Sequence, residues 1–121
     1  MGMKFVVCDD DPVIRYLLEV VLGKRGGHDV VAVDDATQVA VNVAQHNPDL
    51  VLLDFMMPGL TGLDVAAELA ADPATAGTPV AFLTGRADIE DQDFTELNVV
   101  GVIEKPFDTS TLATRLLEMI A

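Results

Sequence analysis

The stretch Leu50-Val51-Leu52-Leu53-Asp54 decides the fold. Its four apolar residues are consecutive and do not alternate with polar ones, which is typical of a strand buried on both faces of a parallel sheet. Four other short runs have the same character. They are Phe5 to Cys8, Val30 to Val33, Val80 to Leu83, and Val99 to Ile103. The chain therefore contains five candidate strands of a parallel sheet.

Segments with helical periodicity follow each of these runs. Asp11 with Pro12 is a typical helix start, and Asp35 can cap a second helix. Three further helices are expected: around Leu63 to Ala70, more weakly over Asp88 to Leu97, and over Leu112 to Ile120 with Asp108 or Thr109 as its cap. Strand and helix thus alternate five times, which predicts an α/β fold with right-handed crossovers.

Five strands in a chain of 121 residues fit a flavodoxin-like, doubly wound parallel sheet of order 2-1-3-4-5 with five flanking helices. Neither a linker nor a change of composition divides the chain. We therefore expect a single domain over residues 1–121.

Composition and charge exclude several classes of function. The formal net charge is −13, from 20 acidic and 7 basic residues, so the chain should repel the phosphates of nucleic acids and anionic lipids. No apolar run approaches the ~20 residues needed to span a bilayer, and no signal peptide is recognisable. We expect a cytoplasmic protein. The single cysteine, Cys8, lies inside an apolar run and is expected to be a buried thiol.

Polar residues stand where the predicted strands end. Asp9, Asp10 and Asp11 follow the first strand, Asp54 the third, Thr84 the fourth and Lys105 the fifth. In a sheet of this order, ligands bind at the carboxyl ends of strands 1 and 3. Crowded carboxylates there suit Mg²⁺, and Thr84 and Lys105 can contact the oxygens of a phosphoryl group. Asp54 is then a candidate phosphoryl acceptor.

These segments resemble, over essentially the whole chain, the receiver domains of two-component response regulators, in the chemotaxis-Y-like single-domain type. The matching segments are Val7 to Pro12, Pro48 to Asp54, Met57-Pro58-Gly59 with Gly62, Phe82 to Gly85, and Lys105-Pro106-Phe107. Each is a weak motif alone, but together and in order they are specific. Three settings fit such a domain: a stand-alone receiver, an intermediate in a phosphorelay, or a piece of a hybrid kinase or longer regulator. The ending after Lys105-Pro106-Phe107 looks complete, which favours the stand-alone protein.

The resemblance implies a role for each site residue. Asp54 is the phosphoacceptor, and Mg²⁺, with Mn²⁺ as a substitute, is held by Asp9, Asp10, Asp54 and the backbone carbonyl of Met56. Thr84 is the switch hydroxyl, and Lys105 precedes a cis peptide bond to Pro106. The donor is a phosphohistidine on a sensor histidine kinase or a histidine phosphotransfer protein, and the output is a downstream protein target. The domain catalyses its own phosphorylation and dephosphorylation but turns over no external metabolite.

One position departs from the family pattern. Receiver domains often carry an aromatic residue three positions before the lysine, and this chain has Val102 there. We therefore expect output without an aromatic rotation. Met56 and Arg86 are expected to tune the lifetime of the acyl phosphate through water access.

Two other classes of function remain as alternatives. A pseudo-receiver would keep the fold as an interaction module without phosphorylation. An enzyme on a similar sheet is the other: a flavodoxin-like electron carrier, whose FMN phosphate the three aspartates would repel, or a haloacid-dehalogenase-type phosphatase, whose second aspartate is replaced by Met56. A P-loop nucleotidase would need a motif that is absent.

Overall fold

The structure of the chain is a computed structural model, which describes residues 2–85, 94 and 97–121. A parallel sheet of five strands forms its centre, in the order β2-β1-β3-β4-β5. The strands are β1 (Lys4–Cys8), β2 (Asp29–Val33), β3 (Leu50–Asp54), β4 (Val80–Thr84) and β5 (Val99–Glu104). The predicted fold class and strand order are confirmed.

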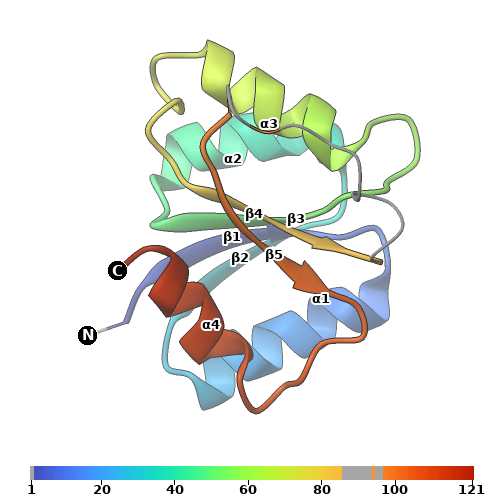
Figure 1. Cartoon of the computed structure of the whole chain (residues 1–121), viewed down its shortest axis with the longest axis vertical. Helices are drawn as coiled ribbons and strands as arrows, with labels where there is room; N and C mark the ends of the chain where they lie inside the picture. Colours follow the sequence, from blue (N-terminus) through green and yellow to red (C-terminus); the bar gives the residue numbers. More distant parts are fainter. Residues whose placement is uncertain (1, 86–93, 95–96) are drawn as a thin grey trace.

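Helices cover both faces of the sheet (Figure 1). The α-helices are α1 (Pro12–Leu18), α2 (Val39–His46), α3 (Gly62–Ala71) and α4 (Leu112–Met119). Helix α1 runs on into a π-helical segment, η1 (Glu19–Arg25), and a short 3-10 turn, η2 (Ala36–Gln38), precedes α2. Helices α1 and α4 lie on one face, and α2 and α3 on the other.

The helix predictions were only partly correct. Four α-helices occur among the described residues, and the helix expected over Asp88 to Leu97 falls almost wholly outside them. The predicted cap of the last helix was wrong, because α4 begins at Leu112 after Thr111. The Asp108 carboxylate instead accepts hydrogen bonds from the backbone N–H and the hydroxyl of Ser110, which closes a separate turn before the helix.

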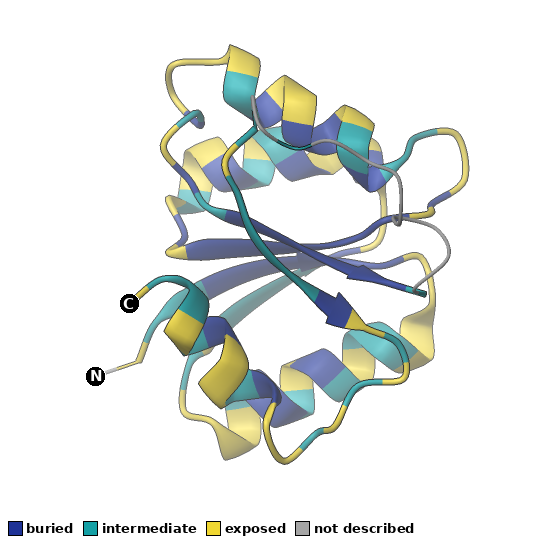
Figure 2. Ribbon diagram, viewed as in Figure 1, coloured by how far each residue is buried: buried dark blue, intermediate teal, exposed yellow. Residues whose placement is uncertain are grey.

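Two apolar layers hold the sheet between the helices. Neighbouring residues of a strand point to opposite faces, so Val6 and Cys8 pack toward α2 and α3, whereas Phe5 and Val7 pack toward α1 and α4. Figure 2 shows the central strands buried and the outer helix faces exposed. Strand β3 is buried along its whole length, as its unbroken apolar run predicted.

The loop from β1 to α1 and the loop from β3 to α3 are each fixed by a helix cap. At the start of α1 the Asp11 carboxylate accepts from the N–H of Val13. At the start of α3 the Thr61 hydroxyl accepts from the N–H of Asp64, whose carboxylate accepts from the N–H of Thr61, a capping box. Both loops therefore leave the sheet with a defined direction.

Among the described residues, no helix is both long enough and apolar enough to cross a membrane.

Candidate functional site

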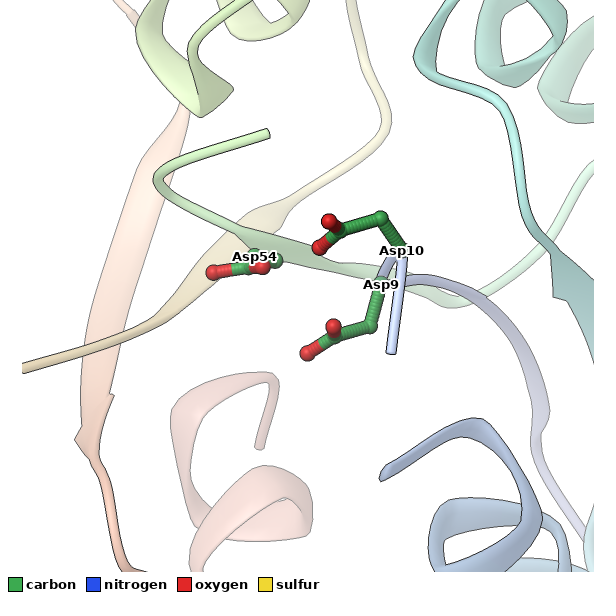
Figure 3. A group of neighbouring side chains, drawn as sticks. All are labelled: Asp9, Asp10 and Asp54. Atoms are coloured by element: carbon green, nitrogen blue, oxygen red, sulfur yellow. The ribbon is translucent and has the colours of Figure 1, made fainter. Parts of the chain in front are cut away.

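The predicted site residues meet at the carboxyl edge of the sheet. Asp9 and Asp10 follow β1, Asp54 and Thr84 are the last residues of β3 and β4, and Lys105 follows β5. Parallel strands that lie side by side end at the same edge, so residues distant in sequence come together. Figure 3 shows Asp9 and Asp10 on the turn after β1 and Asp54 on the end of β3 beside them.

Lys105 joins two of the carboxylates. Its Nζ lies 3.1 Å from Oδ2 of Asp9 and 3.2 Å from Oδ1 of Asp54. The peptide bond between Lys105 and Pro106 is cis, as predicted. Asp9 is fully buried and Asp54 is 5% exposed, and among the described residues both charges share Lys105 as their ion-pair partner.

The donor set fits a hard divalent cation. Asp9, Asp10 and Asp54 each offer a carboxylate oxygen, and these oxygens all lie within 4.8 Å of one another. Two of these side chains are buried and the third, Asp10, is exposed. Mg²⁺ prefers oxygen ligands and keeps several waters, which suits a cluster open on one side.

Burial and charge shift the ionisation of the site. Burial of Asp54 and the neighbouring Asp9 raise the pKa of Asp54 to about 6, although Lys105 and the Met56 amide act in the opposite direction. Burial also opposes the charge of Lys105, but its hydrogen bonds and ion pairs with Asp9 and Asp54 outweigh this, and its pKa lies above its ordinary value. Burial of Asp54, together with the nearby Asp9 carboxylate, thus outweighs what the shared lysine offsets.

The loop after β3 lies close to Asp54. The N–H of Met56 is 3.4 Å from Oδ1 of Asp54, and Met56 forms an antiparallel bridge with Thr61. Gly62 begins α3 so near the strand that an added Cβ would lie 3.0 Å from the carbonyl oxygen of Asp54. The Met56 side chain is 53% exposed. The role of its carbonyl as a metal ligand stays a prediction.

Thr84 is the buried last residue of β4, at the same edge of the sheet. It is 2% exposed, and its hydroxyl donates to the carbonyl of Gly85 at 3.0 Å. Its own carbonyl accepts from the N–H of Lys105, which ties the two residues together. Arg86, expected to control water access to the acyl phosphate, lies outside the described residues.

Val102 lies on β5 directly beside Phe82 of β4. It is half-buried and packs on the core layer below α2 and α3, as does Phe94. The Phe94 ring is 5.1 Å from that of Phe82. An aromatic residue of this chain therefore lies near Val102, although on a different segment. Output without an aromatic rotation stays a prediction.

Sequence reasoning missed one contact of the site. Nη1 of Arg15, on α1, donates to the backbone carbonyl of Asp9 at 2.8 Å. The only signal in the sequence was spacing, because Arg15 lies one helical turn after the cap Asp11. Spacing alone could not show that the side chain turns back toward β1.

Two residues outside the site, His28 and Cys8, also make side-chain contacts. His28 is half-buried: its Nδ1 accepts from the N–H of Met3 at 2.9 Å, and its ring packs edge-on against Phe5. Cys8 is a buried thiol, as predicted, and its Sγ lies 3.5 Å from Sδ of Met57. Burial and then the nearby carboxylates raise the pKa of Cys8 to about 12, which makes it a poor nucleophile.

The fold and the site residues together define a class of protein. A 2-1-3-4-5 sheet with an acidic cluster and a lysine at its switch point is the arrangement of aspartate phosphorylation switches. The chain belongs to the response regulator receiver domain family, whose pattern it matches over residues 5–117. It is a receiver domain of two-component signal transduction, and such domains act as phosphorylation switches and bind Mg²⁺ at an acidic pocket.

Similar proteins agree with this assignment. The DNA-binding response regulator MtrA of Mycolicibacterium smegmatis is 37% identical over 118 residues, which cover 96% of this chain and 50% of MtrA. The chain thus spans about half the length of the curated relatives it matches.

Among solved structures, a sensor protein from Polaromonas sp. JS666 superimposes with a TM-score of 0.89 at 27% identity, covering 98% of this chain and 95% of that one. The receiver domain of the sensor histidine kinase PA1611 of Pseudomonas aeruginosa gives 0.82 at 25% identity, covering 99% and 98% of the two chains. That domain has a magnesium ion coordinated in its active-site cleft.

Proposed function

We propose that this chain accepts a phosphoryl group on Asp54 in a Mg²⁺-dependent reaction and thereby changes the surface it offers to a partner. Asp9, Asp10, Asp54 and the carbonyl of Met56 would hold the cation, for which Mn²⁺ can substitute. Its chemistry there is to neutralise the charge of the phosphoryl oxygens. Lys105 and Thr84 would contact the phosphoryl oxygens that remain.

One observation supports this proposal above the others. Lys105 bridges Asp9 and Asp54, so the acceptor carboxylate already lies between a positive charge and a cluster of metal-binding oxygens. Phosphoryl transfer depends mainly on positioning and charge neutralisation, and this arrangement supplies both. A solvated loop acid would have neither neighbour.

Phosphorylation and dephosphorylation of Asp54 each exchange one bond to phosphorus for another. An oxygen of the Asp54 carboxylate attacks phosphorus, the P–N bond of the donor phosphohistidine breaks, and the bond electrons leave with the imidazole. Water later attacks the same phosphorus, which releases inorganic phosphate and restores the carboxylate. We propose that this domain catalyses both steps itself, because the proposed acceptor, the lysine and the carboxylates that would hold the cation all come from this one domain.

A sensor histidine kinase or a histidine phosphotransfer protein is the proposed donor, and a downstream protein is the proposed target. The net charge of −13 argues against direct contact of these residues with nucleic acid. The proposed location is the cytoplasm.

Intact mass after incubation with acetyl phosphate and Mg²⁺ tests the assignment. The wild type should gain the mass of one phosphoryl group and Asp54→Asn should gain none. Asp34→Asn, which removes an exposed acid at the end of β2, should behave as wild type. Because some receiver domains accept only from a kinase, a negative result is followed by beryllofluoride with Mg²⁺, read as amide shifts around Thr84. No response to either reagent would favour a pseudo-receiver.

A further inference from the structure

Arg15 makes a side-chain contact that its place on a helix would not require. It is half-buried on α1, and its Nη1 donates to the carbonyl oxygen of Asp9 at 2.8 Å. That carbonyl belongs to the peptide unit between Asp9 and Asp10, the two acids that follow β1. The guanidinium therefore binds the backbone of the acidic turn and leaves the carboxylates for other partners.

The same turn is tied at two other points. The N–H of Asp11 donates to Oδ1 of Asp9 at 2.9 Å, and the N–H of Arg15 donates to the carbonyl of Asp11 at 3.1 Å. These bonds fix Asp9 and the start of α1. The Arg15 side chain adds a bond to the carbonyl of the peptide between Asp9 and Asp10, which helps to fix the plane of that peptide.

The orientation of this peptide decides where Asp10 points. A peptide unit is planar, so holding its carbonyl oxygen also holds the N–H and Cα of the next residue. Asp10 is exposed, and within the described part of the chain its carboxylate makes neither a hydrogen bond nor an ion pair. Its direction toward Asp54 is therefore set by the backbone.

We propose that Arg15 is a positioning residue for cation binding, whose guanidinium holds the Asp9–Asp10 peptide so that the Asp10 carboxylate faces Asp54. This inference rests on the proposed function, because it deepens the metal site described there. Arginine suits the role, since it stays charged and offers donors in a rigid plane.

Charge and position act in opposite directions at this residue, which makes the proposal testable. A positive charge beside the cluster repels a cation, so a purely electrostatic Arg15 would weaken binding and its removal would tighten it. A positioning Arg15 strengthens binding and its removal weakens it. The sign of the change separates the two roles.

The experiment is a calorimetric Mg²⁺ titration of the full chain. Arg15→Met should weaken binding about 10-fold, the lower end for losing a residue that orients a metal ligand. Arg15→Lys, which keeps the charge and one donor, should fall between. Arg115→Met is the matched control, because it removes a charge from an exposed position on α4 and should bind as wild type. Unfolding temperatures in EDTA show whether each variant is folded, and Arg15→Lys carries the test if Arg15→Met is not.

A second measurement separates an effect of Arg15 on cation binding from an effect on phosphoryl transfer itself. The Mg²⁺ concentration that half-saturates phosphorylation by acetyl phosphate should rise with the binding constant in Arg15→Met, and the rate at saturating Mg²⁺ should match wild type. Unchanged or tighter Mg²⁺ binding, or a lower saturated rate, would overturn the role of Arg15 and leave Asp54 as acceptor. A wild type that binds no Mg²⁺ and accepts no phosphoryl group would overturn both proposals.

Discussion

The crevice has two regions that differ in burial and in charge balance. Its floor consists of Asp9, Asp54 and Lys105, and its rim consists of Asp10 and Met56. The floor carboxylates are buried and share one lysine, whereas both rim side chains are exposed. The floor holds charge at a cost in stability, and the rim leaves room for a ligand to enter.

This difference shows that unfavourable electrostatic energy is concentrated on the floor of the site. Two carboxylates face one ammonium group on the floor, and burial of Asp54 and then repulsion from Asp9 raise the pKa of Asp54 despite that group. A divalent cation would relieve the repulsion. Changes to the floor should therefore alter the free energy of unfolding strongly, and changes at the rim only weakly.

Lys105→Met should produce the largest loss. It leaves two buried carboxylates without their counter-charge, and breaking a buried pair by removing one partner costs about 3 kcal/mol. Urea unfolding in EDTA at neutral pH measures this, with exposed Lys24→Met as the control. A loss no larger than that of the control would mean that water already screens the floor.

Asp54→Asn should stabilise the metal-free protein, and only above acidic pH. The folded-state pKa of Asp54 is about 6 against an ordinary 3.8, so the folded protein binds this proton more tightly than the unfolded chain does. Wild-type stability from this group is present below about pH 4 and is lost as the pH rises through about 6.

Asp54→Asn has no carboxylate at this position, so it does not lose stability as the pH rises. In EDTA at pH 8 we expect it to be more stable than wild type by about 2 kcal/mol, and the gap should close at acidic pH. Chemical unfolding of both proteins across this range is the measurement, and Mg²⁺ should raise the stability of the wild type more. A gap that is independent of pH would contradict the electrostatic account.

Thr61→Ala should have an intermediate effect, because Thr61 connects the rim to α3. It removes the hydroxyl of the capping box and should lower the free energy of unfolding by about 1 kcal/mol. Thr111→Ala is the matched control, since Thr111 precedes α4 without a side-chain cap bond. Equal losses in the two variants would show that the cap does not fix the loop.

Met56→Ala should have the smallest effect on stability, within ~0.5 kcal/mol, because the side chain is 53% exposed. It should nevertheless change the rate at which phosphorylated protein loses its phosphoryl group, since trimming the thioether alters water access beside Asp54. Release of phosphate after removal of the donor measures that rate. If the rate stays the same, Met56 does not tune the lifetime.

Much of the fold was readable from particular residues. The unbroken apolar run of β3 predicted a fully buried strand, and Asp11 with Pro12 predicted the start of α1. The failures lie where local signals compete. Apolar spacing alone would place Ala44 inward beside Val43, but Ala44 is exposed and the buried residues of α2 are Val39 and Val43. The π-helical segment after Leu18 has no signal in apolar spacing.

By itself, the sequence determined the sheet and the identity of the acidic residues, because strand periodicity and strand ends are local properties of the chain. Only the tertiary structure decided what each polar group contacts. The ion pairs of Lys105 and the bond from Arg15 to the Asp9 carbonyl join separate elements or span a turn, and their geometry depends on how helices pack on the sheet. Local sequence carries no record of those directions, since a side chain's orientation is fixed by the neighbours that burial brings to it.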